Sequence, residues 1–190
     1  MSEAVRCFVA VNLPALLREE IGEFFTGLRG TVRGVRWVAA ANLHLTLKFL
    51  GDVESGQVSR VANAIAGALE ERSPVEVALS GAGVFPPRGR PRVVWLDLSA
   101  GAEGIASLQA EVERALEPLG FPRERRPFTP HLTVGRVRNL RDAAPLLSAV
   151  DAAREREWGG FTASSVDLVK SEIFPTGARY SILRQVRLKG

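Results

Sequence analysis

The chain contains two histidines, and each begins a His-Leu-Thr tripeptide, His44-Leu45-Thr46 in one place and His131-Leu132-Thr133 in the other. Both tripeptides stand in apolar runs typical of β-strands, in which successive side chains point to opposite faces. His44 and Thr46 should therefore share one face, with Lys48 beyond them. His131 and Thr133 should likewise project together. Each motif offers an imidazole and a hydroxyl on one side and a core-facing leucine on the other.

Two histidines of this kind suit general acid–base chemistry at a phosphodiester. Imidazole titrates near neutral pH, so one ring can accept a proton from an attacking water while the other protonates the leaving oxygen. Threonine hydroxyls can hydrogen-bond to non-bridging phosphate oxygens, and an arginine can stabilise the charge that develops there. We predict that His44 and His131 are the catalytic pair and that Thr46 and Thr133 bind the phosphate.

The elements that must position these motifs occur twice along the chain. The apolar run 8–13 precedes a helical pattern and then His44, and the run 93–98 precedes another helical pattern and then His131. Phe85-Pro86 follows the first histidine at nearly the distance at which Phe174-Pro175 follows the second. Two like halves related by an approximate two-fold axis would bring both polar faces to one cleft.

Hydrophobic periodicity predicts strands at 6–12, 44–50, 75–80, 92–98, 131–137, 164–171 and 180–188, with amphipathic helices between them. This order favours an α+β fold. We expect a bilobal, duplicated structure in which two mainly antiparallel sheets line a central cleft and the helices pack outside. No linker or low-complexity segment divides the sequence, so we expect one domain, 1–190, made of two intimately packed lobes.

Composition narrows the class of protein. The single cysteine, Cys7, the lack of an apolar run of about 20 residues and the lack of a signal peptide predict a cytoplasmic protein away from membranes. The net charge is +4, and three of the 25 basic residues are lysines, the rest being arginines. Arginine binds phosphate bidentately, so a polyanionic partner is plausible, although codon usage explains such a bias equally well.

The sequence favours neither a metal nor a cofactor. It has no His-x-x-x-His, no cysteine cluster and no carboxylate inside either histidine motif, and these are the groupings that hold catalytic metals. It also lacks a Gly-x-x-x-x-Gly-Lys-Ser/Thr phosphate loop, which disfavours ATP-dependent chemistry. We therefore expect no metal site and no cofactor.

The motifs resemble those of the 2H phosphoesterase superfamily, and specifically the RNA 2',3'-cyclic phosphodiesterases, also called 2'-5' RNA ligases. The similarity spans essentially the whole chain and is carried by five segments: 8–11, 36–38, 42–51, 127–136 and 177–180. The resemblance implies metal-independent opening of a terminal 2',3'-cyclic phosphate to a 2'-phosphate. It also implies ATP-independent 2'-5' joining of RNA ends in the reverse direction.

The resemblance assigns one further phosphate-binding residue, Arg136, which follows the second motif. Strict alternation would place Arg136 on the face opposite His131. A bulge at Gly135 could re-aim it, and otherwise it is a solvated arginine at a strand end. The sequence leaves open which histidine is the acid and which is the base.

Other interpretations use the same residues. The substrate is either RNA ending in a 2',3'-cyclic phosphate, tRNA fragments included, or a small cyclic nucleotide or ADP-ribose cyclic phosphate. A third alternative is a nucleotide- or RNA-binding module without turnover. Two groups of arginines either contact an RNA backbone or lie in solvated loops. Three aromatic residues either stack on a base or pack in the core. These are Arg88, Arg90, Arg92, Arg123, Arg125 and Arg126, and Phe85, Phe174 and Tyr180. We expect a monomer.

Overall fold

The structure is a computed structural model that describes residues 4–139, 141–175 and 177–190, and it confirms the α+β class. Nine strands and four helices are found in this part of the chain. They are β1 (Ala4–Asn12), α1 (Ala15–Gly27), β2 (Val35–Trp37), β3 (His44–Glu54), α2 (Ser55–Leu69), β4 (Val75–Phe85), β5 (Val93–Ala100), α3 (Ala102–Leu116), β6 (Leu132–Val137), α4 (Ala144–Ala152), β7 (Glu157–Ala163), β8 (Ser165–Phe174) and β9 (Gly177–Arg187).

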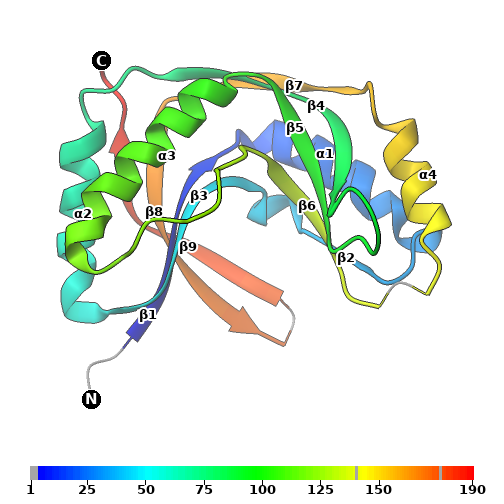
Figure 1. Ribbon diagram of the computed structural model, residues 1–190, viewed down its shortest axis with the longest axis horizontal. Coiled ribbons are helices and arrows are strands. Elements are labelled where there is room, and N and C mark those ends of the chain that lie inside the picture. Colours follow the sequence, from blue (N-terminus) through cyan, green and yellow to red (C-terminus); the bar gives the residue numbers. More distant parts are fainter. Residues whose placement is uncertain (1–3, 140, 176) are drawn as a thin grey trace.

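The strands form one curved antiparallel sheet in the order β7-β4-β5-β6-β3-β1-β8-β9, with the short β2 paired to β6 (Figure 1). This order is symmetric about the junction of β6 and β3, which carry the two histidine motifs. At that junction the strands share a single pair, Leu45 with Leu132. The two sheets expected from the sequence are therefore joined at this pair into one continuous sheet.

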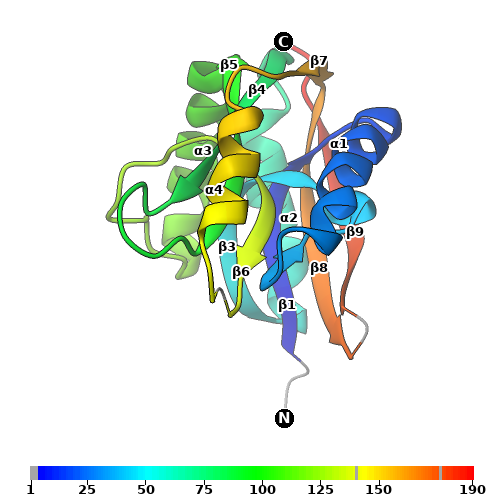
Figure 2. The same ribbon diagram turned by 90° about the vertical axis from the view of Figure 1, so that its right-hand side faces the viewer.

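The helices cover the two ends of the convex side. Helices α2 and α3 lie together at one end, and α1 and α4 lie at the other (Figures 1 and 2). The apolar stripe of α3, with Ile105, Leu108 and Val112, is buried as its periodicity predicts. Packing crosses the duplication, because α3 from the second half contacts β3 from the first, and α1 from the first contacts β7 from the second.

All seven predicted strands are present, and two more were missed. The three residues of β2 are too few to show a period. The edge strand β7 contains Gly159-Gly160, which lowers its strand propensity. A Cβ atom on Gly160 would lie 2.9 Å from the carbonyl oxygen of Val77 on β4, so the glycine permits a close approach that local propensity does not reveal.

Buried apolar residues form one large cluster that contains residues from all four helices and both halves of the chain. A second, small cluster of Phe8, Ala10 and Val169, with Tyr180 packed against it, lies apart from this core. Among the described residues, no helix is both long and apolar enough to span a membrane.

Candidate active site

The predicted site residues meet around the central strand pair. Leu45 and Leu132 are buried in the large core, and they are paired directly across β3 and β6. Alternation about this pair turns the side chains of His44, Thr46, His131 and Thr133 to the opposite, concave face of the sheet. All four are partly exposed there. The structure thus brings together the two motifs that the sequence predicted to share a cleft.

A β-bulge in β3 corrects one prediction. Thr46 pairs with Ala10 of β1 and Lys48 with Val9, so Leu47 is an extra residue without a partner. The bulge reverses the alternation beyond Thr46. Lys48 therefore turns into the helix side, where it is 4% exposed, instead of following His44 and Thr46. Phe49 turns to the concave side, where its ring centroid lies 6.2 Å from that of Phe8.

A β-bulge also occurs in β6. Thr133 pairs with Trp95 of β5 and Gly135 with Val94, which leaves Val134 as the extra residue. Beyond it Arg136 is exposed, and its charge acts on His44. The re-aiming of Arg136 that strict alternation forbids is therefore supplied by this bulge. Gly135 itself has no room for a side chain, because a Cβ atom would lie 2.8 Å from the Trp37 ring.

Both histidines are held by the same local contact. Nδ1 of His44 lies 2.8 Å from the carbonyl oxygen of Asn42, and Nδ1 of His131 lies 2.7 Å from that of Thr129. A carbonyl only accepts, so in each ring Nδ1 carries the proton and donates it. This fixes the ring orientation and leaves Nε2 as the atom available for proton transfer.

His44 has the more enclosed environment. Its ring stacks on Phe8 at 4.7 Å and meets the edge of Tyr180 at 5.4 Å. The pKa of His44 is lowered to about 4, mainly by burial and to a smaller extent by the positive charge of Arg136, while the hydrogen bond to Asn42 acts in the opposite direction. The His44 ring is therefore neutral at neutral pH, with an unprotonated Nε2.

His131 rests against a different aromatic pair. Its ring lies edge-on to Phe85 at 5.3 Å and to Trp95 at 6.4 Å, and those two rings stack on each other at 4.7 Å. Gly83 on β4 makes this arrangement possible, because a Cβ atom there would overlap the Trp95 ring. Phe85, a candidate for base stacking, thus packs beside the second histidine.

A buried ion pair lies directly behind the first motif. Nζ of Lys48 lies 2.7 Å from the Glu113 carboxylate on α3 and donates to the carbonyl oxygen of Pro122 at 2.8 Å. Gln109 and the backbone N–H of Glu124 also donate to Glu113, at 3.1 and 3.3 Å. This network ties β3 to α3 and to the segment that leads towards His131.

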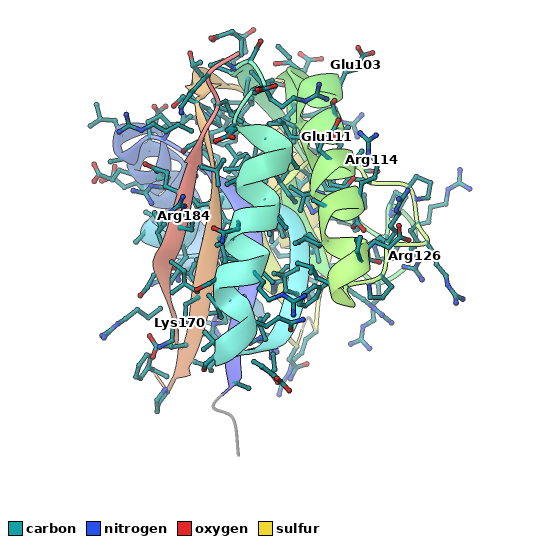
Figure 3. All side chains as sticks on the ribbon, turned by 90° about the vertical axis from the view of Figure 1, so that its left-hand side faces the viewer. Glu103, Glu111, Arg114, Arg126, Lys170 and Arg184 are labelled. Carbon is teal, nitrogen blue, oxygen red and sulfur yellow. The ribbon has the colours of Figure 1, made fainter. Side chains whose placement is uncertain are left out.

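The other arginines and aromatic residues are scattered. All six loop arginines are exposed; Arg123 pairs with Glu117 at 2.7 Å, and Arg126 projects into solvent beyond α3 (Figure 3). The outer face of α3 has mixed charge, with an ion pair between Glu111 and Arg114. Phe174 lies at the end of the β8–β9 hairpin under the guanidinium of Arg179, at 4.9 Å.

Sequence reasoning missed several residues that shape the site. Asn42 and Thr129 stand two residues before each histidine, a matched spacing that could have indicated their shared role. Phe8 and Trp95 belong to the apolar runs that begin the two halves. No local pattern in the sequence predicts the ion pair between Lys48 and Glu113, which is 65 residues away.

Among the residues that the structure describes, no group of three or more histidine, cysteine or acidic side chains is placed to hold a metal ion. A cavity with a volume of about 380 Å³ adjoins His44. A larger one, of about 760 Å³, lies between β3, α2 and the segment 119–124, and neither histidine lines it.

Comparison with known proteins relates the whole chain to one family. The sequence model of the 2'-5' RNA ligase superfamily matches residues 17–172. The chain is 36% identical over 184 residues to the RNA 2',3'-cyclic phosphodiesterase of Methanothermobacter thermautotrophicus, covering 97% of this chain and 99% of that protein. It is 34% identical over 192 residues to the RNA 2',3'-cyclic phosphodiesterase of Thermus thermophilus, covering 98% and 91%.

Solved structures share the fold over nearly their full lengths. The protein TT0787 of Thermus thermophilus superimposes with a TM-score of 0.81 at 29% identity, covering 97% of this chain and 98% of that one. E. coli LigT complexed with 3'-AMP superimposes with a TM-score of 0.79 at 26% identity, covering 99% of this chain and 100% of that one.

Proposed function

Since the chain belongs to the 2'-5' RNA ligase superfamily, we propose that it is a phosphodiesterase that opens RNA terminal 2',3'-cyclic phosphates to 2'-phosphates without a metal ion. One observation carries the proposal: two histidines lie on one concave face, each with Nδ1 bound to a backbone carbonyl and Nε2 free. The activity of the curated relatives, which are RNA 2',3'-cyclic phosphodiesterases, supports it.

The environments of the two histidines favour different roles. His44 is neutral at neutral pH because burial and Arg136 lower its pKa to about 4, so its Nε2 can take a proton from water. The water oxygen then bonds to phosphorus as the P–O3' bond breaks. The departing O3' needs a proton, which the remaining histidine, His131, supplies. The products are a 2'-phosphate and a 3'-hydroxyl, and the two protons balance.

The residues around the histidines suit the phosphate. The hydroxyls of Thr46 and Thr133 stand on the same face as the histidines and can donate to the non-bridging oxygens. Arg136, on the same face beyond the bulge in β6, supplies a positive charge where negative charge develops. The family's 2'-5' joining reaction needs no extra group: a 5'-hydroxyl replaces water, and loss of O3' leaves a 2'-5' linkage.

We also propose that residues 1–190 act as a single domain of two lobes. Helices from each half pack on strands of the other, and one buried cluster joins both halves. Neither half alone contains both histidines, so the chemistry requires the whole chain.

The test is turnover of a short oligoribonucleotide ending in a 2',3'-cyclic phosphate, with EDTA present and ATP absent. We expect a 2'-phosphate product, lost in both His44→Ala and His131→Ala when these variants melt like the wild type. A folded wild type that leaves RNA intact but opens a small cyclic nucleotide or an ADP-ribose cyclic phosphate would replace the RNA assignment. Binding without turnover of any of these would indicate a binding module.

A further inference from the structure

The cavity beside His44 contains two polar atoms whose hydrogen-bonding capacity is unused. Nε of Arg18 and Oδ1 of Asp167 are both buried and lack a hydrogen-bond partner, and both residues line this cavity of about 380 Å³. Buried polar atoms without partners are rare, because each costs the free energy of a missing bond. One donor and one acceptor at the same cavity indicate a ligand that offers the complementary pair.

The two side chains are held in place by their other atoms. Nη1 of Arg18 donates to the carbonyl oxygen of Ala41 at 3.2 Å, and Oδ2 of Asp167 accepts from Nδ2 of Asn12 at 2.7 Å. Asp167 is completely buried, and Gln185, its cross-strand neighbour on β9, also lines the cavity. Burial raises the pKa of Asp167, while hydrogen bonds from the side chains of Asn12 and Gln185 lower it. A carboxylate has about four acceptor positions, so these two bonds leave capacity for a ligand.

The walls of the cavity suit a flat aromatic ring. Phe8 and Tyr180, which contact each other at 4.9 Å, line it next to His44, and Leu13, Pro14, Phe161 and Ile182 add apolar surface. Its volume falls within the range of small-molecule sites, roughly 300–1,000 Å³. The larger cavity near α2 is a poorer site for a nucleotide, because three carboxylates line it against two basic side chains and neither histidine reaches it. These residues are Asp52, Glu54, Glu124, Lys48 and Arg60.

We infer that this cavity is a nucleobase subsite, in which Asp167 accepts a hydrogen bond from the exocyclic amino group of the base and Arg18 donates one to a ring acceptor. The inference rests on the proposed function, because the phosphate bound at the histidines anchors the ribose at the mouth of the cavity. The edge of the base farthest from the ribose then points inward. That edge carries the amino group of cytosine and adenine, and a carbonyl in uracil and hypoxanthine.

Two pairs of substrates of equal shape test this inference. We expect cytidine 2',3'-cyclic phosphate to be opened with a kcat/KM roughly tenfold above that of the uridine compound, and the adenosine compound similarly above the inosine compound, as a single hydrogen bond to a charged group predicts. Asp167→Asn presents an amide donor in place of the carboxylate acceptor and should reverse both preferences. Asp97→Asn, an exposed carboxylate outside this cavity, is the matched control and should preserve them.

Arg18→Gln provides a second variant that leaves Asp167 intact. The ring nitrogen next to the amino group is an acceptor in cytosine and adenine, whereas the same nitrogen in uracil and hypoxanthine carries a hydrogen. This change should therefore raise KM for the cytidine and adenosine compounds more than for the uridine and inosine compounds. Equal kcat/KM within each pair for a folded, active wild type would overturn the subsite while leaving the proposed chemistry standing. So would a preference that persists in a folded Asp167→Asn. Absence of turnover with cyclic phosphates of any kind, RNA included, would instead refute the proposed function.

Discussion

The two halves of the chain present the same strand motif with different ends. After His44 and Thr46 the bulge in β3 exposes the ring of Phe49, whereas after His131 and Thr133 the bulge in β6 exposes the guanidinium of Arg136. The residues directly after the bulges also differ, because Lys48 forms a buried ion pair where the other half has Gly135. The duplicated backbone places equivalent atoms around one centre, and the substituted side chains make the two histidines unequal.

This inequality has a direct chemical use. A general acid must start protonated and a general base unprotonated, and different environments favour this division between two groups of the same kind. His44 lies in the first half, where Phe49 and not an arginine ends the motif. Its pKa is lowered by burial and by Arg136 of the second half. The second half thus tunes a group that the first half supplies.

The largest expected effect separates the roles of the two histidines. His44→Ala and His131→Ala should each reduce kcat/KM on a cyclic phosphate by roughly two to four orders of magnitude, the usual contribution of a positioned acid or base. With a p-nitrophenyl phosphodiester, whose leaving group needs no proton, only His44→Ala should remain strongly impaired. Equal losses with both substrates in both variants would contradict the assignment of His44 as base.

The second comparison concerns Lys48 and Gly135, the residues that follow the two bulges. Lys48→Met leaves the Glu113 carboxylate buried without its partner and should lower the free energy of unfolding by about 3–5 kcal/mol. The double variant Lys48→Met/Glu113→Leu removes both charges and should recover most of the loss. Chemical denaturation measures all three proteins; a double variant no more stable than Lys48→Met would show that the charges do not account for the effect.

The third comparison concerns Phe49 and Arg136, the residues that end the two motifs. Arg136→Met should lower kcat/KM about 100-fold, as removal of one transition-state donor does. The variant should also move the acid limb of the pH profile of kcat/KM to a pH above about 4. The reason is that the positive charge of Arg136, which helps to lower the pKa of His44 to about 4, is removed. The limb should stay below pH 6.5, since burial is the larger cause. Phe49→Met and Arg136→Lys are the controls, and a limb that shifts in them as well would contradict this coupling.

The smallest expected effect is on stability as a function of pH. The pKa of His44 is about 4 in the folded chain against 6.5 for an unperturbed histidine, so between these values the unfolded chain binds a proton that the folded chain does not. This contribution to stability is complete above pH 6.5 and is lost as pH falls through the window. It amounts to about 2 kcal/mol between pH 7 and pH 5. His44→Gln should flatten the profile, whereas an unchanged slope would refute the lowered pKa.

Local patterns were enough to predict that the two histidine motifs meet on one face, because alternation and the repeated His-Leu-Thr motif act over a few residues. They predicted the α+β class, seven strands and the shared face of the two histidines and two threonines. They placed Lys48 on the wrong face, because a bulge depends on the register of the partner strand β1, which lies about 40 residues earlier in the sequence. The contact between Lys48 and Glu113 and the cavity at Asp167 likewise form only when distant segments pack together.

The crossed packing of the helices has a consequence for how the molecule could be divided. The exposed loop at residues 86–90 separates β4 from β5, and a cut there would leave one histidine motif in each piece. Because α3 belongs to the second piece yet covers β3, and α1 belongs to the first yet contacts β7, each fragment alone would leave apolar surface without its cover. The two fragments, when co-expressed, should therefore associate. Activity should appear only in the associated pair, so the chain could be used as a split enzyme that reports association.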